Sequence, residues 1–136
     1  MKPHIEEAQR ALRLADRDIY AFTVLKKETD AHLSVVYFHA QQAVEKLLKA
    51  VLFSAQIEFR RTHDLTELAF LLQQNGVQIP IAATELARLN PFAVTYRYDD
   101  IEIDAFRLSR EEATQWLNSL RMWAENELNE RCGENE

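Results

Sequence analysis

The chain has 136 residues, of which 47% are hydrophobic, and it contains only two Gly and three Pro. This length and composition suffice for one domain with a real hydrophobic core, and the scarcity of turn residues favours long helices over a sheet. The net charge of −6, from 16 Lys and Arg against 22 Asp and Glu, argues against a general nucleic-acid coat.

Two long helices are expected in the first half of the chain. Residues 4–27 carry apolar residues three or four positions apart, which indicates an amphipathic helix. Residues 30–56 contain no Gly or Pro and are rich in helix formers, so they predict a second helix capped by Thr29 or Asp30. One stripe of this helix is apolar and faces the core. A different face carries a polar stripe of His39, Gln42, Lys46 and Lys49.

Shorter elements follow. Asp64, with Glu67 three residues later, has the pattern of a capping box and opens a third helix, with Thr62 as a competing cap. This helix is expected to end at the Asn75-Gly76 pair. Residues 80–90 predict a fourth helix, which the pair Asn90-Pro91 should break or kink.

The last third of the chain divides into an irregular stretch and a final helix. Residues 91–108 are expected to form a loop with a helical start, packed down by its aromatic residues. Ser109 and Glu112 form a second capping box at the start of the last helix, whose polar tail at 125–136 is expected to fray. The fold class predicted is all-α: an antiparallel up-and-down four-helix bundle with an additional short helix. Residues 1–136 make one domain, with a core of about 4–130.

Three polar segments are candidates for a shared binding cleft. The polar stripe supplies hydrogen-bond donors and positive charge. The sequence R-R-T-H-D at 60–64 places cations and a histidine at a helix N-terminus, where anions are favoured. The sequence T-Y-R-Y-D at 95–99 suits stacking on a base while pairing with a phosphate. The predicted ligand-binding residues are Gln42, Lys46, Lys49, His63, Asp64, Arg97 and Tyr98. Solvated lysines, a helix cap and a loop salt bridge are the structural alternatives for the same residues.

The sequence lacks most standard catalytic and cofactor motifs. Two glycines cannot build a Gly-rich phosphate loop, no Ser is flanked by Gly, and neither H-E-x-x-H nor E-x-x-H occurs. The single cysteine, Cys132, rules out a cysteine zinc cage and an internal disulfide. We therefore expect no metal and no cofactor. With no signal segment and no apolar run near the roughly 20 residues of a membrane span, we expect a cytoplasmic protein without membrane contact.

Three segments together resemble the HEPN family (higher eukaryotes and prokaryotes nucleotide-binding domain). They are H-A-Q-Q-A-V-E-K-L-L-K-A at 39–50, R-T-H-D-L at 61–65 and Y-R-Y-D at 96–99. The resemblance implies an all-α bundle that is usually a homodimer. Prokaryotic members are often encoded beside a minimal nucleotidyltransferase as toxin–antitoxin pairs, and many members are metal-independent ribonucleases.

The chain departs from the family in its ribonuclease motif, which is Arg, four to six residues, then His. No His here follows an Arg at that distance. After Arg97 the corresponding positions hold Glu102, Ile103 and Asp104, and acids there would repel an RNA phosphate. This departure favours a binding module over an enzyme.

Three functions remain open from the sequence. The first is a non-catalytic or weakly catalytic HEPN module that forms a homodimer and binds both a nucleotidyltransferase partner and a nucleotide or RNA. The second is a ribonuclease toxin with a non-standard residue set, in which His39 or His63 is the general base and Arg97 stabilises the phosphorane. The third is a purely structural interaction module.

Overall fold

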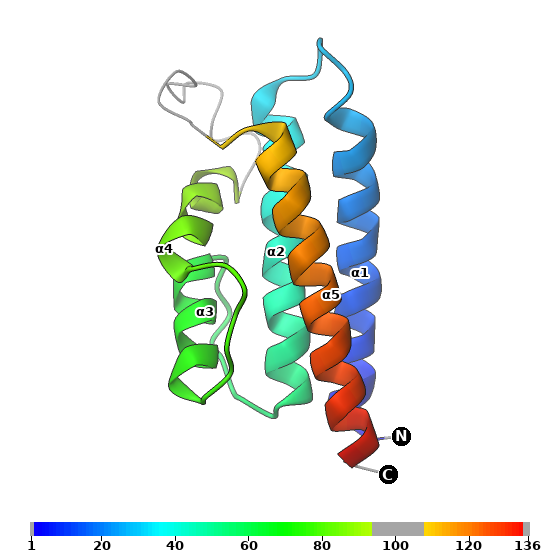
Figure 1. The fold of residues 1–136 in the computed structure, drawn as a ribbon, viewed down its shortest axis with the longest axis vertical. Coiled ribbons are helices and arrows are strands. Elements are labelled where there is room, and N and C mark those ends of the chain that lie inside the picture. Colours follow the sequence, from blue (N-terminus) through cyan, green and yellow to red (C-terminus); the bar gives the residue numbers. More distant parts are fainter. Residues whose placement is uncertain (1, 94–107, 135–136) are drawn as a thin grey trace.

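The computed structural model describes residues 2–93 and 108–134, and every regular element in these ranges is helical. The elements are α1 (Pro3–Leu25), α2 (Leu33–Ser54), α3 (Leu65–Gln74), α4 (Ala83–Leu86), the 3₁₀ helix η1 (Ala87–Phe92) and α5 (Arg110–Glu134). The all-α class and the four-helix bundle with an additional short helix are confirmed (Figure 1).

Helix α2 lies at the centre of the bundle and contacts α1, α3, η1 and α5. Directions alternate along α1, α2, the α4–η1 segment and α5, so these elements form the up-and-down bundle (Figure 1). The connection from α2 returns along the bundle before α3 begins, and α3 therefore runs in the same direction as α2. Helix α3 is the additional short helix, on the outer side of the bundle.

The central position of α2 explains why it buries more than one stripe. Besides the predicted apolar stripe, the helix also buries residues on its other faces: Tyr37, Gln41, Glu45, Leu48, Ala50 and Ser54. A helix that packs on several neighbours is apolar around most of its circumference. Its buried polar residues therefore need partners inside the protein, and these partners define the site described below.

Two of the predicted helix starts are confirmed, and the predicted start of α2 is wrong. Asp64 Oδ1 accepts from the backbone N–H of Thr66 at 2.9 Å, and Ser109 Oγ accepts from that of Glu112 at 3.0 Å. Helix α2, however, starts three residues later than expected, and its cap is His32, whose ring accepts from the N–H of Ser34 at 3.1 Å. Neither Thr29 nor Asp30 caps this helix.

Two other predicted boundaries differ from the structure. The expected helix over 80–90 is a single turn, α4, followed by the 3₁₀ helix η1, which continues through Pro91. Helix α5 continues to Glu134, so most of the tail at 125–136, for which fraying was expected, is helical in the structure. Burial of Leu128 and the ion pair from Arg131 to Glu127, at 2.6 Å, stabilise this last part. Most of the expected loop at 91–108 lies outside the described residues.

Candidate functional site

Two buried carboxylates organise the polar stripe of α2. Asp18 on α1 and Glu45 on α2 are only 8% and 4% exposed. A buried charge is costly unless it is paired and hydrogen-bonded, and both carboxylates have such partners on the polar stripe or next to it. Lys46 and Lys49, two of the predicted ligand-binding cations, are therefore paired with the protein's own acids.

Asp18 joins the first half of the stripe to α1. His39 Nδ1 donates to Asp18 Oδ1 at 3.0 Å, and Lys46 Nζ donates to Asp18 Oδ2. Burial raises the pKa of the Asp18 carboxyl, but the hydrogen bonds from His39 and Lys46 outweigh burial, so its pKa lies below the usual value. Asp18 is therefore a carboxylate at neutral pH, and it neutralises the charge of Lys46.

Glu45 joins the second half of the stripe to the segment before α3. Its Oε2 accepts from Lys49 Nζ at 2.9 Å, and its Oε1 accepts from His63 Nδ1 at 2.9 Å and from Gln41 Nε2 at 3.1 Å. Gln41 also donates to the His63 carbonyl at 3.1 Å and accepts from Gln42 at 2.7 Å. The structure thus brings Gln42, Lys49 and His63 into one network.

The remaining predicted ligand-binding residues lie elsewhere. Asp64 turns away from Glu45: besides capping α3, its Oδ1 accepts from Asn90 Nδ2 at 3.0 Å. Asn90 in turn accepts from the N–H of Leu65 at 2.9 Å, so Asp64 belongs to the junction of α3 with η1. Arg97 and Tyr98 lie outside the described residues.

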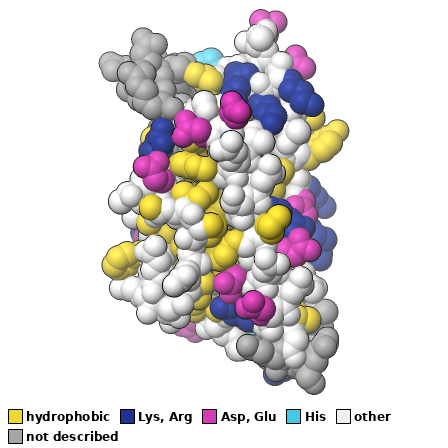
Figure 2. All heavy atoms as spheres, in the orientation of Figure 1, with side chains coloured by type: hydrophobic (Ala, Val, Ile, Leu, Met, Phe, Trp, Pro, Cys, Tyr) yellow, Lys and Arg dark blue, Asp and Glu magenta, His cyan; other side chains and the backbone are white. Residues whose placement is uncertain are grey.

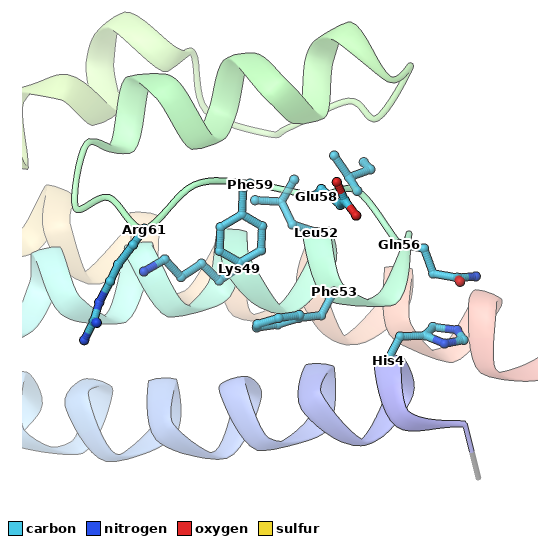
Figure 3. A pocket seen from close by; sticks show the side chains of 9 residues that line it. His4, Lys49, Leu52, Phe53, Gln56, Glu58, Phe59 and Arg61 are labelled. Atoms are coloured by element: carbon cyan, nitrogen blue, oxygen red, sulfur yellow. The ribbon is translucent and has the colours of Figure 1, made fainter.

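A hollow of about 690 Å³ opens beside Lys49, between the C-terminal half of α2, the segment 56–61 and the start of α1 (Figure 3). Its volume falls in the range of small-molecule sites. The lining residues are His4, Lys49, Leu52, Phe53, Gln56, Ile57, Glu58, Phe59 and Arg61.

Aromatic rings lie at the middle of this hollow and cationic groups beside them. The rings of Phe53 and Phe59 meet edge to face, with centroids 5.2 Å apart, and Lys49 Nζ lies 6.0 Å from the centroid of the Phe59 ring. Figure 3 shows Arg61 at one end and His4 at the other. The Nε2 atom of His4 is buried without a hydrogen-bond partner.

A second hollow, of about 240 Å³, adjoins the first because both are lined by Lys49 and Phe53. It lies between α1 and α2, and it adds Glu7, Arg10, Ala11, Leu14, Glu45 and Lys46 to the lining. We call the two hollows together the α1–α2 groove. Within the described ranges, neither Arg10 nor Arg61 has a carboxylate within 4.0 Å, so both remain able to pair with an anion.

Sequence reasoning missed the aromatic part of the groove and both buried acids. The sequence does contain a signal for the aromatic part of the groove. Phe53 and Phe59 flank the end of α2, and Phe59 directly precedes Arg60 and Arg61. Glu45 is four residues from both Gln41 and Lys49, the spacing of neighbours on a helix. No local signal identifies Asp18, because its partners are on another helix.

Comparison with known proteins gives one match. A family model described as HEPN domain matches residues 4–125, nearly the whole chain, and confirms the resemblance of the motifs. No curated protein and no solved structure is significantly similar to the chain.

The described ranges also bear on metal binding and on membrane insertion. Residues 2–93 and 108–134 contain no group of three or more His, Cys, Asp or Glu placed to hold a metal ion. None of the helices found there is both long enough and apolar enough to span a bilayer.

Proposed function

Because this chain belongs to the HEPN domain family, we propose that it is a non-catalytic module that binds a nucleotide, free or at the end of an RNA, in the α1–α2 groove. The observation that carries the proposal is the aromatic pair Phe53 and Phe59 with Lys49 and Arg61 around one hollow. Aromatic faces stack on bases, and cations next to them bind the phosphate, which is the combination that a nucleotide requires.

The charges in the groove determine how the phosphate is bound. Lys49 gives one hydrogen bond to Glu45, and an ammonium group has three donors, so it can hold a phosphate oxygen as well. Arg61 is exposed and has no carboxylate nearby among the described residues. The phosphate therefore lies between Lys49 and Arg61, and the base packs against Phe59.

The proposal that the protein is non-catalytic is supported by the sequence and by the contacts of the two candidate bases. The Arg-x4–6-His motif of the family's ribonucleases does not occur in the chain. His39 and His63 each use Nδ1 to bind a buried carboxylate, Asp18 or Glu45, and these bonds connect α2 to α1 and to the segment before α3. Both histidines therefore have a structural role that does not require a substrate.

Family membership also supports three statements about the biological context. In this proposal the protein is a cytoplasmic homodimer, and its partner is a minimal nucleotidyltransferase encoded beside it in a toxin–antitoxin pair. The molar mass in solution tests the homodimer. Co-purification of the two co-expressed proteins tests the pairing.

The nucleotide site can be tested by titrating AMP into the protein and measuring the heat of binding. Phe59→Leu removes the stacking surface and is expected to weaken AMP binding about 5- to 100-fold, since stacking on an aromatic side chain is worth about 1–3 kcal/mol per base. Arg61→Met is expected to weaken AMP binding about tenfold and to leave adenosine binding unchanged, because only AMP carries the phosphate.

The control is Phe70→Leu, which changes an exposed aromatic residue on α3, away from the groove. It should bind AMP like the wild type. Absence of AMP binding by the wild type, or equal affinities for wild type and Phe59→Leu, would contradict the nucleotide site. A complex with the nucleotidyltransferase in the absence of nucleotide binding would favour the purely structural interaction module.

One contact favours the ribonuclease as a second candidate. The side chain of His63 is 61% exposed although its Nδ1 is fixed by the buried Glu45, and this arrangement leaves Nε2 for a substrate proton. We expect purified protein to leave RNA intact in the presence of EDTA, as a binding module should. Cleavage that is lost in His63→Gln and kept in His4→Gln would instead assign the protein to the ribonucleases.

A further inference from the structure

A second group of cations lies at the other end of the bundle, where α1 ends and α5 begins. Lys26, Lys27 and Arg110 line a hollow of about 470 Å³, which we call the α1–α5 cleft. Its other lining residues are Glu111, Thr114 and Gln115. Figure 2 shows Lys and Arg side chains gathered at this end, over the tops of α5 and α1.

Neutral groups hold two of these cations in place. Lys26 Nζ donates to Thr114 Oγ1 at 2.8 Å, and Arg110 Nη1 donates to the Lys26 carbonyl at 2.6 Å. Thr114 in turn donates to the Arg110 carbonyl at 2.7 Å. The two side chains are therefore ordered before any ligand arrives, which lowers the entropy cost of binding one.

The cations of the cleft lack the carboxylate partners that six other described cations have. In the parts that the structure describes, Lys46, Lys49, Arg60, Arg88, Arg121 and Arg131 each lie within 4.0 Å of a carboxylate. No such carboxylate is found there for Lys26, Lys27 or Arg110. The helix dipole of α1 explains Lys26 and Lys27 at its C-terminal end but not Arg110, which lies at the N-terminal end of α5.

We propose that the α1–α5 cleft binds a phosphate monoester or diphosphate group. Such groups carry about two negative charges and several acceptor oxygens, and they match a pocket whose three cations and one amide outweigh its single acid, Glu111. A carboxylate would leave most of these donors unused. The cleft shares no lining residue with the α1–α2 groove, so this site is independent of the proposed nucleotide site.

The test is calorimetric titration with inorganic pyrophosphate at low ionic strength, where screening is weak. The wild type should bind, and Lys27→Met should lower the affinity about tenfold, because a hydrogen bond to a charged group is lost. Lys27 is exposed and has no structural contact of its own in the described residues, so the variant should fold normally. Glu111→Gln should raise the affinity, since it removes a negative charge from the cleft.

Arg13→Met is the matched control, because Arg13 is also an exposed cation on α1 without a nearby carboxylate in the described part of the chain. It should bind pyrophosphate like the wild type. Absence of binding, or equal affinities for wild type and Lys27→Met, would overturn the proposal. So would a loss of pyrophosphate binding in Arg61→Met, since the anion would then occupy the groove. Unchanged pyrophosphate binding in Arg61→Met, with AMP binding weakened, supports two separate sites.

Discussion

Replacing Glu45 with alanine is expected to lower the free energy of unfolding by about 3 kcal/mol, as measured by urea denaturation at neutral pH. The side chain accepts hydrogen bonds from Lys49, His63 and Gln41. Removing one partner from a buried ion pair leaves the other charge without compensation, at a cost of about 3–5 kcal/mol. The lower limit applies because Lys49 and His63 are partly exposed and water replaces some of the lost bonds.

Two further variants distinguish the loss of this network from the general effect of removing an acidic side chain. Glu130→Ala removes an exposed carboxylate of α5 that has no ion pair among the described residues, and it should change the free energy by no more than about 0.5 kcal/mol. The double variant Glu45→Leu with Lys49→Leu should recover much of the loss, because replacing both charges with apolar groups removes the unpaired charge. A loss in Glu45→Ala no larger than that in Glu130→Ala would contradict the network.

Replacing Tyr37 with alanine is expected to cost about 3–5 kcal/mol of stability, the range for truncating a large buried aromatic residue. Tyr37 is 2% exposed, and its ring packs against Phe22 of α1 and Phe92 of η1. Its hydroxyl donates to the carbonyl of Leu108, just before α5, at 2.8 Å. One side chain of α2 thus connects three other elements, and its loss leaves a cavity among them.

Tyr37→Phe isolates the hydroxyl, because it keeps the ring and removes the contacts of the hydroxyl with the Leu108 carbonyl and with Arg110. It should cost about 1 kcal/mol, the net value of one hydrogen bond. Tyr20→Ala serves as the control: Tyr20 is 72% exposed on α1, and its truncation should be nearly neutral. Thermal and urea denaturation of the four proteins measure the differences. Similar losses in Tyr20→Ala and Tyr37→Ala would show that Tyr37 does not join the elements.

Local sequence rules identified most of the helices because these rules act over three or four residues. The caps at Asp64 and Ser109 and the left-handed Gly76 illustrate this. Where the rules failed, tertiary contacts decided the outcome. The end of α5 remains helical because Leu128 is buried, and residues 80–90 divide into α4 and η1 as Leu86 and Leu89 enter the core.

The site was harder to predict because its charges pair between segments distant in sequence. Lys46 and Lys49 are both cations on the polar stripe, but one binds Asp18 on α1 and the other Glu45 on its own helix. This difference depends on how α1 and α2 align, which the sequence of either helix alone does not specify. Asp64 shows the opposite case: its cap was predicted from the sequence, and the same cap directs it away from His63.

The length of α1 has a thermodynamic consequence, because both the α1–α2 groove and the α1–α5 cleft lie along this helix. Twenty-three residues at 1.5 Å per residue separate the ends of this helix by about 34 Å, and about 18 Å still separate Leu14, which lines the groove, from Lys26, which lines the cleft. Occupants at the two ends would therefore be distinct molecules, each with its own saturation curve. Their contributions to the melting temperature should add, as expected for sites far enough apart to share no contacts.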